Sequence, residues 1–117
     1  MGRTNEFTLV ADADFTGKLG YAVKVKAELV HKTPVGTIAG AGEAIDGIVT
    51  DITAGAPQVL AVAKVGDIAL ACLGGAVTVG DELIVAEGGK LVKGTGKVVA
   101  KALATGAENE LVPVIIK

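Results

Sequence analysis

The sequence is poor in aromatic residues. Among its 117 residues are two phenylalanines, one tyrosine and no tryptophan, although 50% of the chain is hydrophobic. The core must therefore be built from Ala, Val, Ile and Leu, which bury less area per residue than aromatic rings do. The mean hydropathy of +0.57 is high for a soluble chain. We infer that part of this apolar surface is buried between subunits.

Long apolar runs and clusters of basic charge are also missing. No apolar run approaches the roughly 20 residues that span a bilayer, and residues 1–6 contain no apolar signal core. The net charge of −2 is scattered along the chain, and Lys24 and Lys26 alternate with valines, which is typical of the solvated face of a strand. The sequence therefore predicts neither membrane insertion nor nucleic-acid binding. We expect a cytosol-like compartment before release by lysis or assembly.

Residues that could carry chemistry are few. Cys72 and His31 are the only cysteine and histidine, so an internal disulfide is excluded and a zinc site lacks ligands. A Cys-His nucleophile pair is the functional alternative, but the apolar run around Cys72 favours a buried thiol. Asp12 and Asp14 could share a calcium ion, yet the further ligands of a calcium loop are absent. Residues 36–42 fit neither phosphate-binding fingerprint. We expect no enzyme activity, metal or cofactor.

The tripeptide Val-Gly-Asp occurs twice, at residues 65–67 and 79–81. Gly accepts positive φ and Asp bonds to nearby backbone, so both tripeptides predict turns. Each is followed by a short apolar run, Ile68–Leu73 or Leu83–Ala86, which we interpret as strands. Residues 87–90 then predict a hairpin turn. The stretch is a β meander without a catalytic residue set.

The rest of the chain also predicts strands. Residues 31–43 are expected to form a loop, with a short extended piece at Val35–Ala39. Pro113 removes a ladder donor, so the last strand is expected at a sheet edge or with a bulge, and such an edge invites a neighbouring subunit. Residues 56–64 could form a helix on propensity alone, but we favour a strand. The prediction is an all-β chain of roughly eight strands, with the further strands at Tyr21–Val30, Ala44–Ile52, Gln58–Lys64, Lys97–Ala104 and Glu110–Lys117.

Residues 1–20 are the least regular part of the sequence. Both phenylalanines lie here, and aromatic side chains are enriched in interface hot spots. One interpretation is an arm that contacts a partner or a neighbouring subunit through Phe7, Leu9, Val10 and Phe15. The alternative is that residues 7–10 add an ordinary strand to the domain itself.

The order of these elements resembles the capsid decoration, or cement, proteins of tailed bacteriophages. The resemblance covers about two-thirds of the chain. It rests on the Ala/Gly/Val-rich, aromatic-poor composition and on the order of turns and strands. It includes the strand and Ala-Gly turn of Ile48–Gln58, the run Val79–Val85, the hairpin Glu87–Lys90, the Thr-Gly step and strand of Thr95–Leu103, and the apolar last strand Leu111–Ile116.

The resemblance implies one compact β-barrel-like or tulip-like domain, here residues 21–117 after an arm at residues 1–20. It implies a non-enzymatic structural protein that binds the major capsid protein on the outer surface of the virion and cements the head. Before assembly it would lie in the host cytoplasm. A homo-oligomer is expected, a trimer with a dimer as the alternative. The competing functions are a small-molecule-binding barrel and an accessory barrel domain of a larger assembly.

Overall fold

The computed structural model describes residues 6–30, 32–53, 55 and 58–117. This part of the chain folds into ten strands, and none of its segments is a helix long and apolar enough to cross a membrane. The predicted all-β fold is confirmed. The strands are β1 (Glu6–Ala11), β2 (Ala22–Val30), β3 (Thr33–Ile38), β4 (Gly47–Ile52), β5 (Val59–Lys64), β6 (Ile68–Cys72), β7 (Glu82–Val85), β8 (Leu91–Lys93), β9 (Ala100–Ala102) and β10 (Leu111–Ile116).

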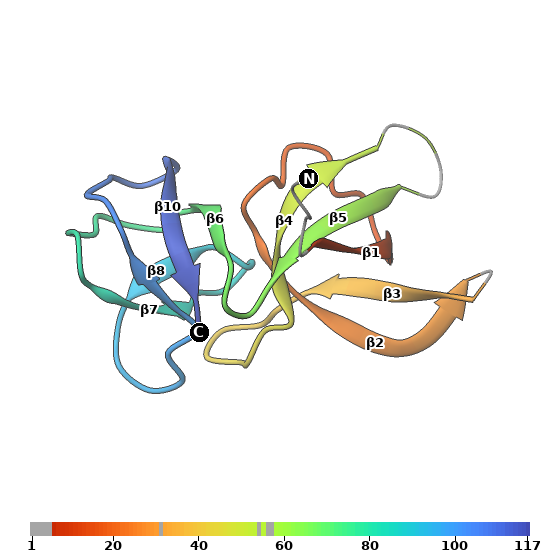
Figure 1. Ribbon diagram of the computed structural model, residues 1–117, viewed down its shortest axis with the longest axis horizontal. Helices are drawn as coiled ribbons and strands as arrows, with labels where there is room; N and C mark the ends of the chain where they lie inside the picture. The colour runs from red at the N-terminus through yellow and green to blue at the C-terminus, as the bar shows by residue number, and fades with distance from the viewer. Residues whose placement is uncertain (1–5, 31, 54, 56–57) are drawn as a thin grey trace.

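The first five strands form a closed barrel in the order β1-β3-β2-β4-β5. Strand β1 closes it, pairing antiparallel with β5 (Leu9 opposite Leu60) and parallel with β3 (Val10 opposite Val35). The other five strands form a sheet in the order β6-β10-β9-β7-β8. A bridge between Leu73 and Leu91 brings the two ends of this sheet together. Figure 1 shows the barrel and the sheet side by side, with the chain crossing between β5 and β6.

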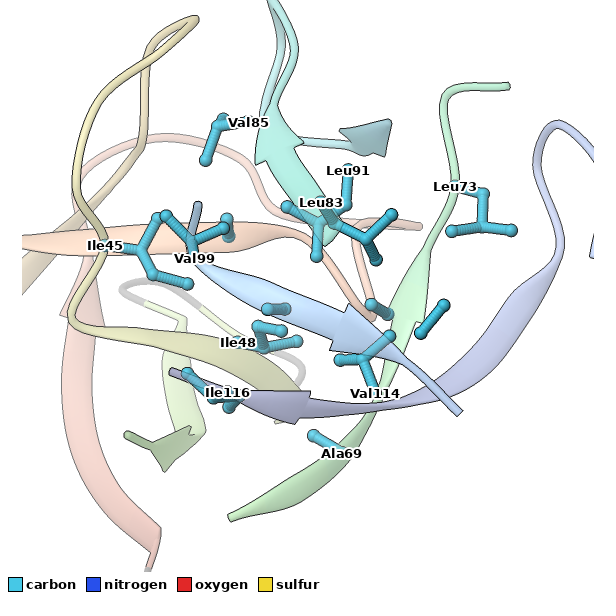
Figure 2. Close-up of a cluster of buried hydrophobic side chains, with 14 of the residues drawn as sticks. Ile45, Ile48, Ala69, Leu73, Leu83, Val85, Leu91, Val99, Val114 and Ile116 are labelled. Atoms are coloured by element: carbon cyan, nitrogen blue, oxygen red, sulfur yellow. The ribbon is translucent and has the colours of Figure 1, made fainter. Parts of the chain in front are cut away.

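Two apolar clusters hold these parts together. The smaller one fills the barrel and contains Leu9 and Phe15, both fully buried. The larger one covers one face of the sheet and also includes Ile48 of β4 and Ile45, which lies just before β4. Figure 2 shows these two isoleucines among the sheet's side chains. Because the larger cluster draws on both parts, burial of apolar surface joins the barrel to the sheet.

The two Val-Gly-Asp tripeptides form the same turn. Gly66 and Gly80 have φ of 96° and 92°, a left-handed conformation that costs other residues about 1–2 kcal/mol. Asp67 donates its N–H to the Lys64 carbonyl at 3.0 Å and accepts the Lys64 N–H on Oδ2 at 3.3 Å. Asp81 makes the same two bonds with Thr78, at 3.0 and 2.8 Å. The predicted turns are confirmed, and each carboxylate closes its own turn.

The segment expected to be a loop with a short extended piece at Val35–Ala39 contains a regular strand, β3, over residues 33–38. Pro34 and Gly36 favoured a loop because both residue types are common in turns. In the structure, Gly36 pairs with Val25 of β2 and Ala11 of β1. A Cβ at Gly36 would lie 2.8 Å from Leu9 Cδ1. The glycine therefore makes room for a core side chain within a regular strand, as glycines in strands often do.

The last strand is internal, so the expected edge or bulge is wrong. Strand β10 pairs with β6 on one side and β9 on the other, without a register shift. The Pro113 carbonyl accepts the Leu103 N–H at 2.9 Å, and the nitrogen of a strand residue faces the same side as its carbonyl. The missing donor therefore faces the chain just past Ala102, where β9 has ended.

Candidate functional site

Residues with catalytic or metal-binding side chains do not converge in the described part of the chain. No group of three or more His, Cys, Asp or Glu there could hold a metal ion. Asp14 Oδ1 accepts the Thr16 N–H at 2.9 Å, whereas Asp12 Oδ2 lies 3.8 Å from Lys26 Nζ, so the two carboxylates are engaged separately. Cys72 is buried in β6, and His31 lies outside the described residues.

The two carboxyl groups whose pKa is shifted, those of Asp14 and Glu43, take part in local turns. No polar or charged residue in the described part is classed as buried. The hydrogen bond with Lys24 (Nζ–Oε2 2.8 Å), followed by the bond from the Gly40 N–H, lowers the pKa of Glu43. The side-chain and backbone hydrogen bonds of Thr16 lower the pKa of Asp14. Both carboxyls are exposed, and both shifts favour the ionised form that bonds locally.

A pocket of about 540 Å³ lies where the barrel meets the sheet; we call it the junction pocket. Its size suits a small ligand, but several of its polar atoms already make hydrogen bonds within the chain. Gln58 Oε1 accepts the Phe15 N–H at 2.6 Å, and Gln58 Nε2 donates to Thr16 Oγ1 at 3.2 Å. Asp51 Oδ1 accepts the Ile52 N–H. The pocket therefore offers mainly apolar contact, and it is lined by Thr16, Gly17, Leu19, Asp51, Ile52, Thr53, Gln58, Cys72, Asn109 and Leu111.

The structure shows the strand alternative for the N-terminal segment. β1 is a barrel strand paired on both sides, and residues 1–5 of the expected arm lie outside the described residues. Leu9, Val10 and Phe15 are 0%, 7% and 0% exposed, and Phe7 is half-buried. Their contact with a capsid or a neighbouring subunit stays a prediction. In this structure they pack in or against the barrel's own core.

The structure brings together an apolar surface that the sequence reasoning did not locate. Ile68 and Leu70 of β6 are 65% and 53% exposed, and Leu111 of β10, the neighbouring strand in the sheet, is 44% exposed. Opposite residues of paired strands share a face, and the register joins Ile68 with Ile115, Leu70 with Pro113 and Cys72 with Leu111. Leu103 lies opposite Pro113. We call this surface the outer face, made of Ile68, Leu70, Leu103, Leu111, Pro113 and Ile115.

A signal for the outer face was present in the sequence. Ile68 and Leu70 alternate with Ala69 and Ala71, so both faces of β6 are apolar, which is typical of a strand covered on both sides. Only the alanine side is covered here, by the large apolar cluster. The excess of apolar residues inferred from composition is partly gathered on this exposed side.

Comparison with known proteins supports the fold. No family model matches the sequence, and no curated protein matches it. Among solved structures, the chain is similar to one described as the N base of the head fiber gp8.5 of bacteriophage phi29, with a TM-score of 0.77 and 16% identity over 96% of this chain and 92% of that one. The chain therefore has the fold of a phage head-associated protein, in agreement with the resemblance found in its sequence.

Proposed function

We propose that this chain is a non-enzymatic structural protein of a bacteriophage virion that binds the outer surface of the capsid and stabilises the head. The observation that carries the proposal is the fold shared over nearly the whole chain with the base of a phage head fiber. The sequence adds independent support, because its order of turns and strands resembles capsid decoration proteins. The proposed partner is the major capsid protein, and the proposed location is the virion surface after a period in the host cytoplasm.

The chemistry of the described residues fits a binding role. The pKa shifts are downward and belong to exposed turn carboxyls, whereas acids and bases that catalyse reactions usually lie in clefts with pKa values moved toward neutrality. One competing function is a small-molecule-binding barrel. Only the volume of the junction pocket supports it. Such a site needs several convergent polar groups that are free to bind a ligand.

Sedimentation with undecorated heads tests the proposal. Heads of the encoding phage assembled without this chain are mixed with the purified protein and pelleted. We expect the protein to pellet with them and to saturate at a fixed number of copies per head. Heads that already carry the protein serve as the control and should take up no more. A protein that stays in the supernatant at all concentrations contradicts capsid binding and leaves the accessory-domain alternative.

A further inference from the structure

The hairpin of β2 and β3 extends beyond its neighbours in the barrel. β2 pairs with β4 at only two residues, Ala22 and Val23, and β3 pairs with β1 at only two, Val35 and Gly36. Beyond these residues the two strands pair only with each other. Figure 1 shows that this part of the two strands lies on the side of the barrel away from the sheet.

The end of this hairpin has no core of its own. We call residues 27–30 and 32–34 the hairpin tip. None of its described side chains is buried, and Leu29, at 68%, is the most exposed large apolar side chain in the described part of the chain. A ribbon of two strands is only marginally stable in water, because it has no second layer against which to bury a face. Insertion of the tip into a partner would supply that missing layer.

The turn of the hairpin holds a lysine in a strained conformation. Lys32 has φ of 67°, which glycine adopts freely and other residues adopt rarely. Residues that stay in such a conformation are found preferentially at binding sites. Lys32 is exposed and has no ion pair within the described residues, whereas Lys24 and Lys26 lie beside carboxylates at 2.8 to 3.8 Å. The tip therefore presents an unpaired positive charge together with Leu29.

The charge of the hairpin is opposite to that of the rest of the molecule. Residues 22–38 contain three lysines and one acidic residue, whereas the rest of the chain contains eight basic and twelve acidic residues. A negatively charged partner attracts the hairpin and repels the remainder of the chain, so the two molecules meet with the hairpin first. The charge pattern thus favours an acidic partner surface.

We infer that the hairpin tip is the element that binds the capsid, in a recess of the capsid protein with an apolar floor and an acidic rim. The floor takes Leu29 and the rim pairs with Lys32. Protein interfaces are commonly built in this way, with a buried apolar anchor inside a ring of polar contacts. The inference rests on the proposed capsid binding and names the part of the chain that makes the contact.

Sedimentation of matched variants with undecorated heads tests the anchor. Leu29→Asp should weaken binding about tenfold or more, because it removes the apolar anchor and places a negative charge in an acidic recess. Val79→Asp is the control, since Val79 is 59% exposed and lies just before β7, in the sheet rather than the barrel; it should bind like the wild type. If Leu29→Asp also binds like the wild type, the hairpin inference is overturned and capsid binding stands. A wild-type chain that does not pellet overturns both.

A substitution at Lys32 separates binding from folding. In Lys32→Gly the turn keeps its positive φ without strain, so the midpoint of urea unfolding should rise, while binding to heads should weaken. Added salt should weaken binding of the wild type more than that of the variant, because the variant has lost the charge that salt screens. Lys97→Gly is the control: it removes the same charge at an exposed position without positive φ, and it should neither gain stability nor lose binding. Wild-type affinity of Lys32→Gly for heads overturns the role of the lysine.

Discussion

At the scale of single residues, several carboxylates in the described part of the chain close turns. In four turns the side chain of the fourth residue accepts the N–H of the first, and the third residue has positive φ. These four carboxylates are therefore bound to the backbone of their own turns. Two of these turns contain the tripeptide Val-Gly-Asp, and the other two have different sequences. The four turns are Gly40–Glu43, Lys64–Asp67, Thr78–Asp81 and Ala107–Glu110.

Substitution of Gly80 tests the need for positive φ. An added Cβ meets nothing within 4 Å, so the cost of Gly80→Ala is backbone strain alone, about 1–2 kcal/mol. Urea unfolding should show this loss. Gly75→Ala is the control, because Gly75 lacks a positive φ and its nearest neighbour would be 4.0 Å away. Equal stability of the two variants would show that the turn tolerates an ordinary residue.

Removing the charge of Glu43 tests the electrostatics of its turn. The folded pKa lies below the ordinary value of 4.5, so the ionised carboxylate stabilises the fold at neutral pH. That contribution is lost as the pH falls below 4.5 through the folded pKa. Glu43→Gln should therefore be slightly less stable than wild type at pH 7 and equal to it in strong acid. A constant difference in melting temperature between pH 7 and pH 2.5 would contradict this.

At the scale of elements, strands with regular alternation were predictable, whereas features set by distant contacts, such as the full extent of β3 and the place of β10 in the sheet, were not. Predicted strands at residues 21–30 and 58–64 match β2 and β5 within a residue. β3 was expected only in part, as a short extended piece at Val35–Ala39, because Gly36 makes room for Leu9, which is 27 positions away in the chain but adjacent in the barrel. β10 was misplaced because the effect of Pro113 depends on where β9 ends, which alternation does not reveal.

Truncation tests the role of β1. Deleting residues 1–15 leaves β3 and β5 without their shared neighbour and removes the buried Leu9 and Phe15. We expect the truncated chain to lose its cooperative thermal transition. Phe15→Ala is the milder variant and should cost about 3–5 kcal/mol, whereas Leu29→Ala, at an exposed position, should cost little. Unchanged melting of the truncated chain would return the segment to its interpretation as a docking arm.

At the scale of the whole molecule, composition and alternation predicted the all-β class, and pairing between distant strands decided the rest. The parallel pairing of β1 with β3 closes the barrel, and β10 completes the sheet between β6 and β9. Neither pairing can be predicted from the alternation of residues within a single strand. The candidate site shows the same division: the sequence pointed to the N-terminal phenylalanines, whereas the structure gathers exposed apolar side chains on the outer face, assembled from β6, β10 and the residue after β9.

The temperature at which filled heads release their DNA tests the proposed cementing role most directly. Heads assembled without this chain are heated with and without the added protein, and release is followed with a dye that cannot enter intact heads. The account predicts that release shifts to higher temperature as protein is added and stops shifting once the heads are saturated. Release at the same temperature from saturated and bare heads would contradict it.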